Sequence, residues 1–290
     1  MTFAIFGYIH LNNLMKQAVT FILVLFSLTH LSAQELPIEK LEEAFADYTS
    51  KIDHATLLKD CGHAFDGPAF LFKQFENNWL DAMLYVTSDS KQNIGKEIYQ
   101  QYVSLGQIDY NYFAKQKAQE ILENLTKNVS RNGVTYTLSI LKSEEINAFA
   151  TLGGYLYITT GLLNFVDSYD ELAFIIGHEV AHEDKLHTQR KVTKLTLSTD
   201  LENMTRVEGF RDIAKRINGT FSPPFDQIDE YEADKFGFEL AQKAGYDASK
   251  FADFFKKMER YEKQDLLKKL TSTHPFAEHR KQCIESYIQN

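Results

Sequence analysis

The chain has 290 residues, and 44% of them are hydrophobic, which is enough to bury one large core or two small ones. Its 31 lysines and arginines stand against 40 aspartates and glutamates, so the formal net charge is −9. This acidic balance argues against nucleic acid as a partner, because binding to a phosphate backbone depends on clustered basic side chains.

Residues 1–33 are typical of a signal peptide. Lys16 is their only lysine or arginine, and it precedes an apolar stretch that ends in a small-residue cleavage site at Ala33. No lysine or arginine precedes Met15, so we expect Met15 to be the true initiator. The alternative is an uncleaved membrane anchor, in which the apolar region is extended toward its N-terminus. We therefore predict an exported protein that is periplasmic, envelope-associated or secreted.

Residues 34–127 are predicted to form an N-terminal helical region, because their apolar residues recur mostly at helical spacing. The region shows no recognisable chemistry of its own. Cys61 and Cys283 are the only cysteines of the chain, so a zinc site built on cysteines is excluded. An exported setting permits a disulfide between them but does not require one.

Three short segments that follow have the composition of strands. Val134–Leu141 alternates and is rich in β-branched and aromatic residues, and Ala148–Thr151 and Tyr155–Thr160 flank a Gly-Gly pair. They predict a small antiparallel sheet, followed by helices to the C-terminus. The expected fold class is α+β and mainly helical, with a catalytic domain over residues 128–290.

A His-Glu-x-x-His pattern begins at His178. On a helix, His178 and His182 project from the same face and can close on one metal ion. Glu179 lies to one side of that metal, where a carboxylate that is not a ligand can accept the proton of the attacking water. A chance match is the alternative, but an acidic start and an apolar run without proline place the pattern inside a buried helix.

The segment around Glu230 offers the third ligand that a zinc site with an open position needs. Glu230 and Asp234 are four residues apart on one helical face, and the small Ala233 and Gly237 permit close approach of another helix. Glu232 lies about 200° around the helix from Glu230, so only one of the two can face the metal. The alternative is a solvated acidic helix start, stabilised by the helix dipole.

With these motifs the chain resembles the family of zinc endopeptidases that includes HtpX, BepA, the Oma-type proteases and the CAAX prenyl endopeptidases. The resemblance extends over roughly residues 134–285. It is carried by four elements in the family's order: Asn147–Ala150 with Gly153-Gly154 and Thr160–Leu163, Gly177–His182, Glu230–Asp234, and Thr273-His274-Pro275 with Arg280. It implies a zincin-like catalytic domain whose active-site helix carries the two histidines.

The resemblance also implies roles for four residues. Glu230 is the expected third ligand of one zinc ion per chain, and Asp234 is expected to orient a histidine ligand through its second ring nitrogen. His274 is expected near the zinc, either as a latch in the open position or as a group that stabilises the transition state. Arg280 is expected to stabilise the oxyanion that forms during attack.

The pattern departs from other zinc peptidases at two points. A metzincin needs glycine at 185 and histidine at 188, whereas this chain has Lys185 and Thr188. His187 does not replace the missing ligand, because it lies about 180° around a continuous helix from His178. We expect His187 at the surface or in packing.

The predicted function is zinc-dependent endoproteolysis of unfolded or misassembled exported or envelope proteins. Residues Gly154, Tyr155, Leu156 and Tyr157 are expected in an edge strand that binds the extended polypeptide substrate. Peripheral association with a membrane or an envelope complex is a further expectation. The alternatives are a chaperone-like quality-control binding module with a latent or structural zinc site, and a zinc hydrolase that acts on other bonds. Glu179 distinguishes an enzyme from a binding module, because a purely structural zinc site does not need a carboxylate beside the metal.

Overall fold

The computed structural model describes residues 77, 88–129, 134–198, 227–261, 274 and 278–289. All of these except Asn77 belong to one compact unit, Met83–Asn290. The predicted signal peptide and Cys61 lie outside the described residues. The helices are α6 (Ser88–Ser104), α7 (Lys115–Thr126), α8 (Thr160–Phe165), α9 (Tyr169–Asp184), α10 (His187–Ser198), α12 (Gln227–Lys243), α13 (Phe251–Tyr261) and α15 (Glu278–Gln289), with a short 3-10 helix at Ala248–Lys250. The strands are β1 (Thr137–Leu141), β2 (Ala148–Thr151) and β3 (Tyr155–Thr159).

The predicted mainly helical α+β class is confirmed, but the sheet is mixed and not antiparallel. Its strand order is β1-β3-β2, with β3 antiparallel to β2 and parallel to β1. The left-handed Gly153 and Gly154, with φ of 80° and 83°, close the tight turn that makes β2 and β3 antiparallel. The sequence of β1 does not determine which strand it pairs with. In the structure it pairs with β3, which therefore lies in the middle of the sheet.

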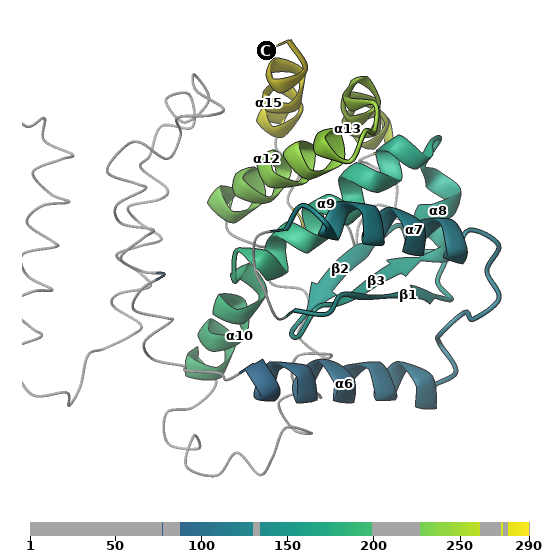
Figure 1. Ribbon diagram of the computed structural model, residues 1–290, viewed down its shortest axis with the longest axis vertical. Helices are drawn as coiled ribbons and strands as arrows, with labels where there is room; N and C mark the ends of the chain where they lie inside the picture. The colour runs from purple at the N-terminus through teal and green to yellow at the C-terminus, as the bar shows by residue number, and fades with distance from the viewer. Residues whose placement is uncertain are drawn as a thin grey trace, which may run out of the picture. The chain divides into compact units, whose positions relative to one another are not determined.

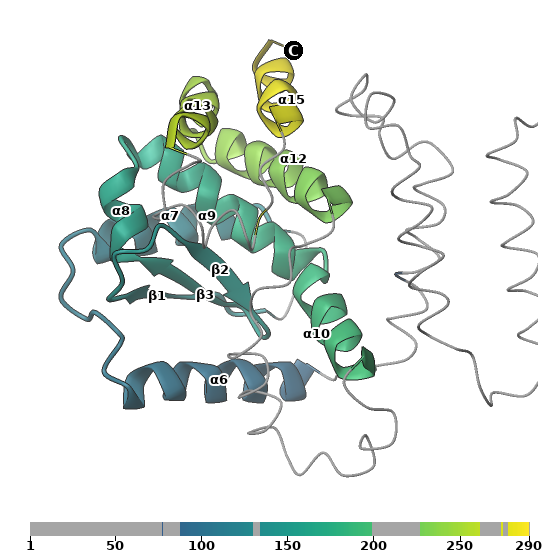
Figure 2. The same cartoon turned by 180° about the vertical axis from the view of Figure 1, so that it is seen from behind.

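Helices cover both faces of the sheet (Figures 1 and 2). Side chains alternate between the faces along each strand. Phe149 and Tyr157 pack with Ile98 of α6 in one apolar cluster, whereas Leu156 and Ile158 belong to a larger cluster that includes residues of α7 and α9. The second cluster is the main core, and α9 runs through it.

Helix α9 is buried on all sides. Every residue from Glu171 to Glu183 is buried, in agreement with the apolar run before the histidines. Ser168 caps its start by accepting a hydrogen bond from the backbone N–H of Glu171 at 3.1 Å. At its other end, Glu183 accepts a hydrogen bond from the backbone N–H of Gly153 at 3.2 Å, which ties α9 to the turn between β2 and β3.

Helices α9 and α12 touch through their backbones at two glycines. A Cβ added to Gly237 would lie 2.6 Å from the backbone nitrogen of His178, and one added to Gly177 would lie 2.9 Å from the carbonyl oxygen of Gly237. Only glycine at both positions permits this approach. The contact brings the N-terminal half of α12 against the histidine face of α9. Among the described residues, no helix has both the length and the apolar character that crossing a membrane requires.

Candidate metal centre

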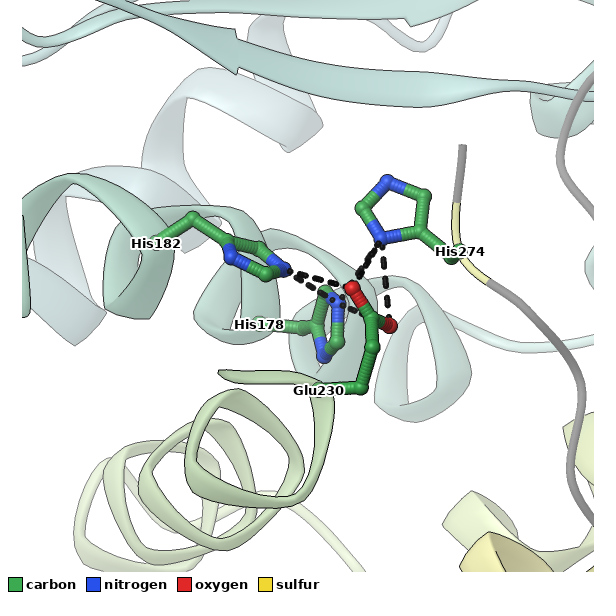
Figure 3. Close-up of side chains that lie close together, drawn as sticks. All are labelled: His178, His182, Glu230 and His274. Atoms are coloured by element: carbon green, nitrogen blue, oxygen red, sulfur yellow. Dashed lines mark hydrogen bonds and ion pairs between the residues drawn. The ribbon is translucent and has the colours of Figure 1, made fainter. Parts of the chain in front are cut away.

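Two histidines of α9 point into the same space (Figure 3). The Nε2 atoms of His178 and His182 are 2.9 Å apart, and both side chains are buried. Burial and the neighbouring His178 hold the pKa of His182 well below its usual range. The His182 ring is therefore neutral, which is the state that binds a metal ion.

Glu230 of α12 faces the two histidines. Its carboxylate oxygens lie 3.5 Å from His178 Nε2 and 3.4 Å from His182 Nε2. Burial alone would raise the pKa of this carboxyl, but the charges of His274 and Arg280 and hydrogen bonds from His182 and His274 hold it well below its usual value. Glu230 is therefore ionised and can serve as a metal ligand.

His274 comes from a separate segment, between α13 and α15, and reaches the same space (Figure 3). Its Nδ1 lies 3.3 Å from His178 Nε2 and 3.1 Å from Glu230 Oε1. The donor atoms of His178, His182, Glu230 and His274 all lie within 4.8 Å of one another. The structure thus brings together four donors.

The spacing of these donors suits a tetrahedral zinc ion. Ligand atoms at about 2.1 Å from a tetrahedral centre are about 3.4 Å apart. Five donor–donor distances, measured to one or the other carboxylate oxygen of Glu230, run from 2.9 to 3.5 Å, and the whole set lies within 4.8 Å. Three nitrogens and one carboxylate oxygen are also the donor types that zinc accepts.

Asp234 and Arg280 contact the donor residues and hold them in position. Asp234 Oδ1 lies 2.9 Å from His178 Nδ1, on the side of the ring that faces away from the other donors. Arg280 donates to Asp234 through Nε at 2.6 Å and through a terminal nitrogen at 2.7 Å, and its other terminal nitrogen lies 2.7 Å from Glu230. Burial alone would lower the pKa of Arg280, but these two carboxylates raise it. This geometry gives Arg280 a holding role, which differs from the predicted oxyanion role.

Glu179 points to the other side of the donor group. Its Oε1 lies 3.5 Å from His274 Nε2, and its Oε2 is buried without a hydrogen-bond partner among the described residues. Glu179 lies at the wall of a pocket that is otherwise mostly apolar. The apolar lining residues are Leu162, Phe174, Ile175, Phe254, Phe255 and Met258.

His187 is completely buried and is not one of the four donors. Its ring lies between His182 and Glu232, with nitrogen contacts of 3.1 and 3.2 Å. Burial alone would raise the pKa of Glu232, but the hydrogen bond with His187 holds it below its usual value. Periodicity did not predict this contact, because a helix that continues from His178 through residue 187 places the His187 side chain on its opposite side.

The predicted substrate strand is not at an edge of the sheet. Tyr155, Leu156 and Tyr157 belong to β3, whose two sides pair with β1 and β2, so the edge-strand prediction is wrong. Gly154 lies in the turn before β3. The edge strand on the side of α9 is β2 (Figures 1 and 2).

Comparisons with known proteins point to one family. Residues 113–288 match peptidase family M48. The chain is 29% identical over 179 residues to a protein of Vibrio cholerae named as a beta-barrel assembly-enhancing protease, a match that covers 56% of this chain and 37% of that protein. It is 28% identical over 171 residues to the mitochondrial metalloendopeptidase OMA1 of Bos taurus, covering 53% of this chain and 33% of that protein. The match therefore spans about a third of the length of these relatives.

Proposed function

Because the chain belongs to peptidase family M48 and is a protease, we propose that it is a zinc-dependent endopeptidase of exported, unfolded or misassembled proteins. The observation that supports zinc is the buried set of four donors whose ligand atoms all lie within 4.8 Å of one another. The signal-like N-terminus supports an exported setting. The name of the Vibrio cholerae relative supports envelope proteins as substrates.

His178, His182 and Glu230 would hold the metal ion in this proposal. When bound, the metal supplies Lewis-acid polarisation of the scissile carbonyl and of the attacking water. Glu179 accepts the proton of that water and delivers it to the leaving amine, since its Oε2 is buried without a partner among the described residues. Asp234 keeps His178 in the right orientation, and Arg280 holds both Asp234 and Glu230 in place.

We propose β2 as the strand that binds the substrate backbone. Within the part of the chain that the structure describes, no strand pairs with the outer edge of β2. An extended peptide on that edge gains main-chain hydrogen bonds with little dependence on its sequence. Such binding suits a protease that acts on unfolded chains.

The apolar pocket supports a preference at one substrate position. Glu179 must reach the nitrogen of the cleaved bond, and that nitrogen belongs to the residue that follows the bond. The side chain of this residue therefore lies beside Glu179, where the pocket is lined by aromatic and aliphatic residues. We propose that the enzyme cleaves before large apolar residues.

Met258→Ala is expected to enlarge this pocket and to shift the preference from leucine toward tryptophan. A change of this size in an apolar pocket alters discrimination by about tenfold or more. Mass spectrometry of the products from a peptide library measures the shift, with the exposed Lys256→Ala on the same helix as the control. An unchanged preference in Met258→Ala would contradict the assignment of the pocket.

His274 fills the place of a fourth donor, so we propose that it holds the enzyme latent. His274→Ala is expected to keep zinc bound and to raise proteolysis by about tenfold, if the closed state is favoured by about 1.4 kcal/mol. The rate of casein cleavage and the zinc content measure both effects. Loss of activity with zinc retained would show instead that His274 stabilises the transition state.

A chaperone-like binding module with a latent or structural zinc site is the second candidate, favoured by the fact that four donors leave no open position. Incubation of the purified protein with unfolded casein, with and without a chelator, separates the two. The proposed enzyme cleaves casein and stops when the chelator is added. A binding module retains casein without cutting it.

A further inference from the structure

His187 lies at the start of α10 and is held from two sides by groups of the site. Its Nδ1 is 3.1 Å from Nδ1 of His182, and its Nε2 is 3.2 Å from a carboxylate oxygen of Glu232. A second carboxylate, that of Asp229, lies 3.6 Å from the same Nε2. Both carboxylates come from α12, the helix that also carries Glu230.

These contacts leave one consistent arrangement of protons. The Nε2 of His182 faces the other donors and carries no proton when it binds a metal, so the proton of that ring is on Nδ1. This N–H then donates to Nδ1 of His187. The proton of His187 is consequently on Nε2, from which it is donated to Glu232. Each ring nitrogen of the pair therefore has one defined role.

The backbone departs from an ordinary helix in order to place His187 there. Leu186, between α9 and α10, has φ of 66° and is the only non-glycine residue with positive φ among those that the structure describes. This conformation is disfavoured for a residue with a Cβ, and such outliers persist where the surrounding structure requires them. In a continuous helix, His187 would lie about 140° around the axis from His182 and could not reach its ring.

We propose that Glu232 and His187 form a hydrogen-bonded relay that fixes the tautomer and the orientation of the metal ligand His182. This inference rests on the proposed metal site. The relay matches the direct contact of Asp234 with His178 on the other ligand. Helix α12 thus supplies a ligand and the support of both histidines. His187 is a positioning residue, because it acts through His182.

Two substitutions of His187 separate hydrogen bonding from packing. Glutamine can accept the N–H of His182 through its oxygen and donate to Glu232 through its nitrogen, whereas phenylalanine fills the space but cannot accept that N–H. Zinc affinity of the full chain, measured by chelator competition, is expected to fall by about 10–100-fold in His187→Phe. His187→Gln is expected to retain most of the affinity, and the thermal unfolding of metal-free His187→Gln should match the unsubstituted protein. Equal zinc affinity in the phenylalanine variant and the unsubstituted protein would overturn the relay.

A measurement on the unsubstituted protein decides the matter if the phenylalanine variant does not fold. Nitrogen-15 NMR of the histidine rings in the zinc-loaded chain is expected to show the proton of His182 on Nδ1 and that of His187 on Nε2. A proton on Nδ1 of His187 would rule the relay out. These readouts do not depend on proteolysis. A chain that binds zinc with this proton pattern but cuts no protein would refute the proposed function and leave the relay standing.

Discussion

Glu179→Gln is expected to retain about one zinc ion per chain and to lose nearly all proteolysis. The amide keeps the shape of the carboxylate but cannot accept the proton of the attacking water. General base and acid catalysis by one side chain contributes about 10²–10⁴-fold to a rate. The initial rate of casein cleavage at equal zinc content measures the loss.

The matched control is Glu239→Gln, at a partly exposed glutamate of α12 that pairs with Lys243. This variant is expected to cleave casein at the rate of the unsubstituted protein. A Glu179→Gln variant as active as the unsubstituted protein would show that Glu179 is not the general base. The assignment of the apolar pocket to the residue after the cleaved bond would then lose its basis.

Glu230→Ala is expected to strip the zinc from the protein during dialysis. Glu230 is one of three proposed ligands, and its loss leaves two imidazole ligands and removes the carboxylate that contacts Arg280. The loss of affinity is expected to exceed the roughly 10–100-fold that is typical of residues that only support a ligand. Metal analysis of the dialysed protein measures it.

Glu232→Ala is the comparison that tests the choice between the two glutamates. Among the described residues, Glu232 contacts His187 and none of the four donors, so this variant is expected to keep one zinc ion per chain when zinc is in excess. Full zinc in Glu230→Ala together with loss of zinc in Glu232→Ala would reverse the assignment of the ligand.

The helical part of the site follows directly from periodicity. The spacing of His178 and His182 predicts a shared face, and so does the spacing of Glu230 and Asp234. The structure places both pairs together, with the small Gly177 and Gly237 at the contact between the helices. Such relations depend on residues within one or two helical turns, which is why a sequence can reveal them.

The features that the sequence did not reveal depend on a break between two helices and on contacts between residues far apart in the chain. The left-handed conformation of Leu186 has no local signal, because glycine is the residue normally found there. Without that break, the contact of His187 with His182 is unexpected. The pairing of β3 between β1 and β2 is likewise set by packing across the sheet and not by either strand alone. The position of Arg280 depends on where α15 docks.

Zinc-dependent proteolysis by this site is tested most directly by a zinc titration of the metal-free protein during casein cleavage. We expect no cleavage without metal, a rise in rate in proportion to added zinc, and a plateau at one zinc ion per chain. Glu179→Gln is expected to bind zinc with the same stoichiometry and to stay inactive throughout. Cleavage by the metal-free protein, or saturation with zinc without any cleavage, would contradict zinc-dependent proteolysis by this site.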